Sequence, residues 1–356
     1  MFSIPSVQTS VANQLTDFLY EKYDAKIDVE SLSVSYDGRV VLEEVFIEDH
    51  HQDTLITAKE ISTSLLNISG LVTGYDLDFG NAEVNELQLN LKRYKGEESD
   101  NLTIFGEKFD SGQPKTQDFS LTIDEINILN GNFTYVDENN KYPNIVSISN
   151  LNINASNLLV DNSDVFVDVN SLNGLEGRGI PIENLKTKFS YTSQFMSLKD
   201  LQLKTEESSL SGSIKFNYES PEAFSDFENK VNLEAQFKPS SINTKDLKVF
   251  YEEFGENENF DFEGNLSGTF NDLNLENWKM RGMDRSVING NLNLKNMLAE
   301  NSSDFKVSGN FNQLSTNYYD LVNLLPNVLG RNLPKELIEI GNINLNGYLE
   351  ATPTTV

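Results

Sequence analysis

Apolar and polar residues alternate along most of this chain, most clearly from residue 119 to residue 154. Alternation with a period of two places one face of a strand in apolar surroundings and the other face in water. Asn130-Gly131 and the polar cluster at 137–144 are typical of turns, because Asn and Gly tolerate positive φ and Asx side chains bond nearby backbone. The stretch therefore predicts a strand, a short turn, a strand, a polar loop and a further strand pair. The apolar groups are Phe119, Leu121 and Ile123; Ile126 and Ile128; Phe133 and Tyr135; and Val146, Ile148, Leu151 and Ile153.

Looser versions of this unit recur from residue 27 to residue 349, which predicts a repetitive, mostly β protein. Five strands of the second half carry a glycine close to alternating apolar positions, in LSGSIKFNY, FEGNLSGTF, INGNLNLKN, VSGNFNQL and NINLNGYLE. Glycine inside a strand marks a bulge, a bend or a close backbone approach. Two interpretations stay open: a sheet bent repeatedly in one direction into a trough, or the ordinary turns and bulges of a β-sandwich.

Helical spacing interrupts the alternation in three places. We expect an amphipathic helix over residues 5–23 and helical insertions at 243–254 and 317–340. The first helix carries a single basic residue, Lys22, so capping the sheet is favoured over lying on an anionic membrane. The polar stretch at 92–118 is either a mobile loop or a short helix packed outside the sheet.

These patterns divide the chain into four expected regions. They are an N-terminal helix at 1–26, a first β-repeat region at 27–118, a central one at 119–240, and a C-terminal one at 241–356 that is truncated at its end.

Charge narrows the range of partners. The 356 residues carry 27 Lys and Arg against 55 Asp and Glu, a formal charge of −28. Such a field repels nucleic-acid phosphates and anionic headgroups, so we expect no nucleic-acid partner. The acidity is interpreted as a soluble face that prevents strand-to-strand aggregation, rather than as specific cation binding. The chain has no cysteine, and neither a membrane span nor a signal peptide is recognisable in it.

No catalytic motif is found, and we expect neither an enzyme nor a cofactor. The two histidines, His50 and His51, are adjacent in a polar loop beside Glu48, Asp49 and Asp53. Consecutive strand side chains point in opposite directions, and no third ligand stands at a set spacing. We therefore expect a solvated acidic loop and no metal site.

The N-terminal block IPSVQTSVANQLTDFLYEKYDAKIDVESLSVSY, followed by VVLEEVFIEDHHQDTLITAKEI, resembles the segment after the membrane anchor of TamB-like proteins, in the form found in Bacteroidetes-type bacteria. These are inner-membrane components of the translocation and assembly module, within the AsmA-like superfamily. The units LTIDEINILNGNFTYVD, SISNLNINASNL, LKTEESSLSGSIKFNY and NLSGTFNDL are similar to the same family.

The resemblance implies an elongated, twisted antiparallel β-sheet that forms an apolar groove, with an N-terminal amphipathic helix and short helical interruptions. It also implies a periplasmic protein, anchored to the inner membrane by a helix missing here, that bridges to the outer membrane. An Omp85-type barrel protein would be its partner through a C-terminal region also absent, so the chain is expected to be an N-terminal fragment.

The function expected is non-enzymatic: the groove holds or conducts phospholipid by burying acyl chains, and so supports outer-membrane biogenesis. An alternative is a scaffold or chaperone for outer-membrane β-barrel proteins, acting by β-augmentation without lipid conduction. A repetitive β-sandwich adhesin ranks last, because no aromatic loop cluster suited to sugar is present. The candidate groove-lining residues are Leu87, Leu89, Ile126, Ile128, Phe133, Leu201, Leu203, Ile214, Phe216, Phe262 and Leu266.

Overall fold

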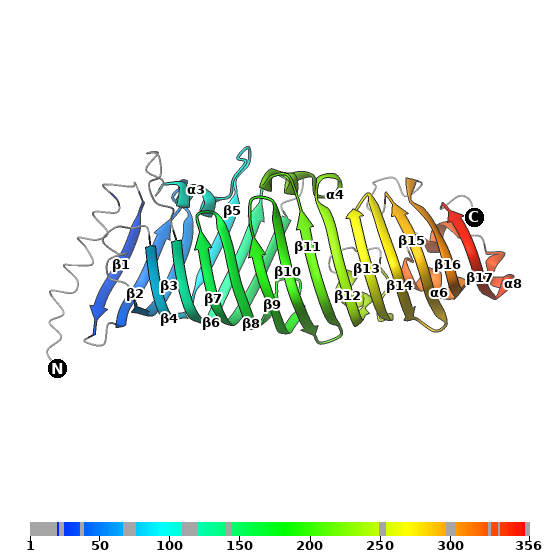
Figure 1. Ribbon diagram of the computed structural model, residues 1–356, viewed down its shortest axis with the longest axis horizontal. Coiled ribbons are helices and arrows are strands. Elements are labelled where there is room, and N and C mark those ends of the chain that lie inside the picture. The colour runs from blue at the N-terminus through cyan, green and yellow to red at the C-terminus, as the bar shows by residue number, and fades with distance from the viewer. Residues whose placement is uncertain are drawn as a thin grey trace. The chain divides into compact units, whose positions relative to one another are not determined.

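The protein is seen here in a computed structural model (Figure 1). The residues that it describes are 20, 25–35, 39–66, 76–108, 120–139, 144–248, 254–296, 304–326, 329–333 and 335–352. The helix expected over residues 5–23 lies outside this set except for Tyr20.

The chain is mostly β, as predicted, and the 17 strands found among the described residues belong to one sheet. Neighbouring strands are antiparallel, except that β6 (Ser120–Asp137) pairs in parallel with β4 (Asp76–Asn85) and β5 (Gln88–Arg93). None of the helices in the described part has the length and apolarity needed to cross a bilayer.

Contacts divide the chain into two compact units, Met1–Glu183 and Asn184–Val356. The boundaries expected from sequence at 118/119 and 240/241 stay predictions. The first unit also contains β1 (Ile27–Val34), β2 (Arg39–Glu48), β3 (Thr54–Leu65), α3 (Asn101–Glu107), β7 (Asn144–Asp161), β8 (Asp164–Glu176) and the start of β9 (Pro181–Tyr191).

In the first unit, α3 resolves the choice left open for the polar stretch at 92–118. Asp100 caps this helix by accepting a hydrogen bond from the Thr103 amide. Phe105 of α3 is buried with Ala25 and Leu55. Part of the stretch is thus a short helix anchored by one aromatic side chain.

The turn predicted at Asn130-Gly131 is wrong. β6 continues through both residues, and the pairing of β6 with β7 shifts register between Ile128 and Phe133. Asn130 has φ 55°, the left-handed conformation that Asn and Gly adopt most easily. The same local preference that favours a tight turn also favours a β-bulge, which inserts a residue without reversing the chain.

The second unit contains strands that pair in chain order from β10 to β17. Its helices include segments within both insertions expected from sequence. The elements are β10 (Phe195–Thr205), β11 (Ser209–Asn217), η1 (Pro221–Asp226), α4 (Phe227–Lys230), β12 (Asn232–Asn243), α5 (Thr244–Lys248), β13 (Asn259–Thr269), β14 (Asp272–Gly282), β15 (Ser286–Lys295), β16 (Lys306–Asn317), α6 (Tyr318–Leu324), α7 (Leu329–Asn332), α8 (Leu337–Ile340) and β17 (Asn342–Ala351).

A row of bulges and glycines crosses the strands of this unit, and we call it the bulge row. On β14, for example, the three-residue step from Leu275 to Trp278 lies opposite the two-residue step from Leu292 to Gly290 on β15. Steps of this kind recur on β10, β12 and β16. The strands that pair with these bulged strands, β11, β13, β15 and β17, each carry a glycine at the same level. The members of the bulge row are Leu201, Gly212, Phe237, Gly264, Trp278, Gly290, Phe311 and Gly347.

Gly290 is required for the approach of β16. A Cβ atom at this position would lie 2.4 Å from the Asn310 carbonyl oxygen and 2.9 Å from the Phe311 Cα. We expect Gly290→Ala to lower the free energy of unfolding by about 1–3 kcal/mol, because backbone atoms must move apart. Trp278 is the single tryptophan of the chain, so its fluorescence during urea unfolding reports on this unit.

The matched control for that substitution is Gln202→Ala, at an exposed position on β10. It should change the unfolding free energy by less than about 0.5 kcal/mol. Equal stability of the Gly290→Ala variant and the unmodified chain would show that the close approach of the two strands is not needed.

Candidate functional site

The first unit carries a continuous apolar row on one face of its strands. Seven side chains are paired strand by strand across β1, β2, β3, β4, β6, β7 and β8. Each is partly buried and none is fully sealed. Neighbouring side chains in the row shield one another only in part, so the row is an apolar surface that stays partly exposed. Its members are Leu32, Leu42, Ile61, Val84, Ile128, Ile153 and Leu172.

The second unit has a larger apolar face, built around five buried residues: Leu233, Ala235, Leu273, Leu275 and Trp278. Ten partly buried apolar side chains pack against this group. Two of them, Phe237 and Phe262, have ring centroids 5.3 Å apart, and Phe262 stacks on Trp278 at the same separation. The Trp278 ring lies over Gly264 of the bulge row, as aromatic side chains do beside glycine in sheets.

Three aromatic residues close one end of this face. Phe227, which begins α4, has its ring centroid 5.7 Å from that of Phe216 and 5.3 Å from that of Phe270. η1 and α4 therefore lie against the ends of strands and leave the middle of the face to the strands themselves.

The structure brings the predicted lining residues together in two sets. In the first unit, Leu89 pairs with Phe133, Val84 pairs with Ile128, and Ala82 pairs with Ile126. Leu87 lies between β4 and β5, where its carbonyl oxygen accepts a hydrogen bond from the Asn132 amide at 2.6 Å. These five predicted residues therefore occupy adjoining positions.

The other six predicted residues lie in the second unit. Ile214, Phe216, Phe262 and Leu266 all pack against the buried group that contains Trp278. Leu201 pairs with Gly212, and Leu203 pairs with Leu210. Whether any of the eleven residues contacts a ligand stays a prediction.

Sequence reasoning missed the centre of the second face. Leu233, Leu273, Leu275 and Trp278 are more buried than the predicted lining residues around them. The signal available was the spacing 273, 275, 278 and 280, in which a step of three inside steps of two marks a bulge that restores the apolar phase.

A hollow of about 310 Å³ lies over β13, β14 and β15. Phe262, Met280 and Ile288 contribute apolar surface to it, and Lys279 and Arg281 contribute positive charge. Glu263 also lines it and forms an ion pair with Lys279 at 2.6 Å. The hollow thus offers apolar atoms beside charged groups of both signs.

A polar network lies in the first unit, where sequence predicted a solvated acidic loop. That expectation is wrong for Asp49, which is only 5% exposed. Its carboxylate accepts hydrogen bonds from the Tyr94 hydroxyl at 2.7 Å and from Asn101 Nδ2 at 2.9 Å. The amides of His51 and Asp53 donate to its other oxygen at 2.9 and 3.0 Å.

Ionisation of this network follows from its hydrogen bonds. Burial raises the pKa of Asp49, but hydrogen bonds from Asn101, Tyr94 and the nearby amides outweigh burial, so the pKa lies below its ordinary value. Burial raises the pKa of the Tyr94 hydroxyl, and hydrogen bonds to the Asp49 and Asp53 carboxylates raise it further. The network thus pairs a charged carboxylate with a neutral phenol.

Comparison with known proteins places the chain in no family: no family model matches its sequence, and no curated protein is detectably similar to it.

Proposed function

We propose that the chain is a non-enzymatic, TamB-like lipid carrier whose apolar sheet faces form grooves that hold phospholipid acyl chains. The observation that carries the proposal is the row from Leu32 to Leu172, in which six consecutive pairings place seven apolar, partly exposed side chains in line. An apolar surface of that extent is a liability in water unless a ligand or partner covers it.

Each main contact between a described helix and the sheet involves a single strand. These contacts are those of α3 with β5, α4 with β13, α5 with β12 and α6 with β16. An acyl chain would fill the uncovered surface without directional bonds, since each buried CH₂ contributes roughly 0.8 kcal/mol.

The dimensions suit such a ligand. Seven strands spaced about 4.8 Å apart give a row of about 29 Å. One leaflet of a bilayer is about 15 Å of hydrocarbon, half of the ~30 Å core. A single row can therefore accommodate the full length of an acyl chain.

The wider setting forms part of the same proposal. We place the chain in the periplasm, as part of a bridge between the inner and outer membranes that supports outer-membrane biogenesis. An Omp85-type barrel protein is the proposed partner of the complete assembly. The net charge of −28 favours contact with acyl chains over binding to the surface of an anionic membrane.

Native mass spectrometry of the purified chain, with lipid extraction from the same sample, tests the proposal. We expect phospholipid at about one molecule or more per chain, and at least a several-fold loss of it in Ile128→Glu and Phe216→Glu. A buried carboxylate on either apolar face disfavours contact with hydrocarbon by several kcal/mol. Ile128→Asn serves as a milder second variant if the glutamate prevents folding.

The matched control is Asn132→Glu, which places the same side chain at an exposed position of β6. It should retain the lipid of the unmodified chain. A folded but lipid-free chain, judged by circular dichroism, would overturn lipid holding. Binding of unfolded barrel strands to that lipid-free chain would then support the scaffold function.

A further inference from the structure

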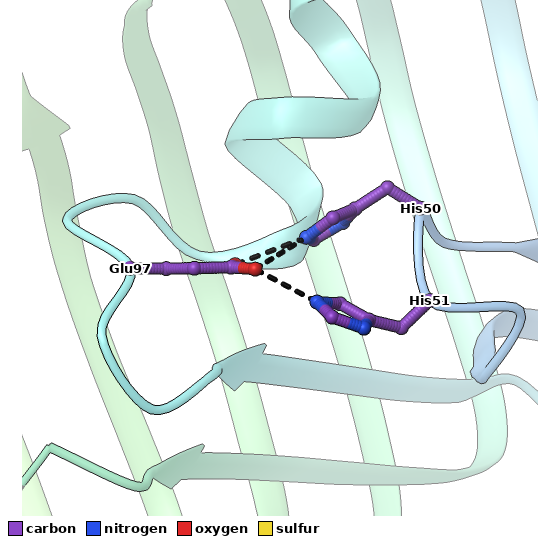
Figure 2. A group of neighbouring side chains, drawn as sticks. All are labelled: His50, His51 and Glu97. Atoms are coloured by element: carbon purple, nitrogen blue, oxygen red, sulfur yellow. Dashed lines mark hydrogen bonds and ion pairs between the residues drawn. The ribbon is translucent and has the colours of Figure 1, made fainter.

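The only imidazole groups of the protein come together at one place in the first unit. The chain contains two histidines and no cysteine. His50 and His51 lie in the turn between β2 and β3, and their rings are T-shaped with centroids 4.4 Å apart. Both rings direct Nε2 toward the same carboxylate, that of Glu97 (Figure 2).

Glu97 supplies the third ligand, which sequence spacing did not reveal. It stands in the loop between β5 and α3, 46 residues after His51. His50 Nε2 lies 3.0 and 3.1 Å from the two Glu97 oxygens, and His51 Nε2 lies 2.7 Å from one of them. The three potential ligand atoms all lie within 4.8 Å of one another.

The two loops that carry these groups are held in place by other bonds. The Asp49 carboxylate accepts hydrogen bonds from the His51 amide and from the Tyr94 hydroxyl. The centroid of the Tyr94 ring lies 3.9 Å from that of the His51 ring. On the opposite side, Asn139 accepts from the Gly96 amide at 2.7 Å and donates to the Glu97 carbonyl at 3.0 Å. The site is thus positioned before any ligand arrives.

The hydrogen bonds leave part of this cluster unsatisfied. His50 Nδ1 is buried and has no hydrogen-bond partner, so Nε2 makes the hydrogen bonds of that ring. The carboxylate oxygens of Glu97 face both histidine rings and can serve as metal ligands.

We propose that His50, His51 and Glu97 form a zinc site, with both Nε2 atoms and a Glu97 oxygen as ligands and a water molecule in the fourth position. Zn–N and Zn–O bonds of roughly 2.1 Å in a tetrahedron place ligand atoms about 3.4 Å apart. The nitrogen–oxygen distances of 2.7–3.1 Å would need to open by roughly 0.3–0.7 Å to reach this separation. Imidazole nitrogen makes zinc a better occupant than calcium or magnesium, which take oxygen ligands.

A zinc ion here would join the β2–β3 turn to the β5–α3 loop. The hydrogen bonds from His50 and His51 to the Glu97 carboxylate would be replaced by bonds from all three side chains to the zinc ion. This role is independent of lipid binding, because it needs no contact with the apolar faces.

Isothermal titration of the tag-free, chelator-treated chain with zinc chloride tests the site. We expect one zinc ion per chain, a rise in melting temperature on binding, and no comparable heat from calcium chloride. X-ray absorption of the zinc-loaded chain should show imidazole ligands, and the two histidines of the sequence, His50 and His51, are their only source.

Variants distinguish zinc coordination by these three side chains from non-specific attraction of zinc to negative charge. The double variant His50→Ala, His51→Ala should lose at least a hundredfold in zinc affinity, and Glu97→Gln at least tenfold. The control Glu98→Gln removes the same charge from the exposed neighbour and should bind zinc normally. Unchanged binding by a folded double-histidine variant, or no binding by the unmodified chain, would overturn the proposal.

Discussion

Replacing Trp278 with alanine should lower the free energy of unfolding of the unit Asn184–Val356 by about 3–5 kcal/mol. The indole is 9% exposed, stacks on Phe262, and lies against Gly264. Alanine would leave a cavity that these rigid neighbours cannot close, because the glycine has no side chain with which to fill it. Circular dichroism during urea unfolding measures the change, since the variant has no tryptophan fluorescence.

The control for this substitution is Glu276→Ala, at an exposed position on the same strand. It should alter stability by less than about 0.5 kcal/mol. Trp278→Phe should lie between the two, because a smaller ring retains part of the stacking. A loss below about 1 kcal/mol in Trp278→Ala would show that the second apolar face does not depend on this side chain.

Removing the Asp49 carboxylate should have a similarly large effect on the first unit. Four donors converge on this buried group, and hydrogen bonds to a charged acceptor contribute roughly 1.5–3 kcal/mol each without being additive. We expect Asp49→Asn to lower the free energy of unfolding by about 3 kcal/mol near neutral pH. The –NH₂ group of the asparagine would face hydrogen-bond donors that the carboxylate had paired, so some of these donors would lose their acceptor.

The pH dependence of that difference gives a sharper test. The pKa of Asp49 is lower in the folded chain than its ordinary value of 3.8, so the unfolded chain binds the proton more readily. The carboxylate therefore stabilises the fold fully above 3.8, and this contribution is lost as pH falls through 3.8 toward the lowered pKa. The gap between the unmodified chain and Asp49→Asn should shrink over this range.

Denaturant unfolding followed by circular dichroism from about pH 7 to pH 3 measures this gap. The matched variant is Asp53→Asn, whose side chain is 59% exposed and which should show a much smaller gap. A gap that stays constant down to the lowest pH would contradict a native-state preference for the charged Asp49.

Alternation was sufficient to predict the β class, because the long strands keep a period of two on either side of their bulges. It failed at Asn130-Gly131, where the same two residues suit a turn and a bulge equally well. Only the partner strand distinguishes the two outcomes, and β7 stays paired with β6 on both sides of the interruption.

The polar clusters were harder to predict, for a different reason. Asp49, Tyr94 and Asn101 are distant in sequence and carry no shared spacing. Glu97 reaches the histidines because β5 pairs with β3, which brings their loops to the same end of the strands. A contact created by strand pairing leaves no local trace, so neither the buried network nor the third ligand could be predicted from sequence.

The alternation of bulge and glycine in the bulge row also limits which insertions and deletions of strands the sheet can accept during evolution. A strand with a bulge and a neighbouring strand with a glycine together make a hairpin. Consecutive hairpins meet through the same pairing of a bulge with a glycine. Loss of β13 with β14 would bring Phe237 opposite Gly290, the same kind of pairing that each already makes. Loss of one strand alone would set two bulges or two glycines side by side. The hairpin is therefore the smallest segment that duplication or deletion can add or remove while the pattern of the sheet is preserved.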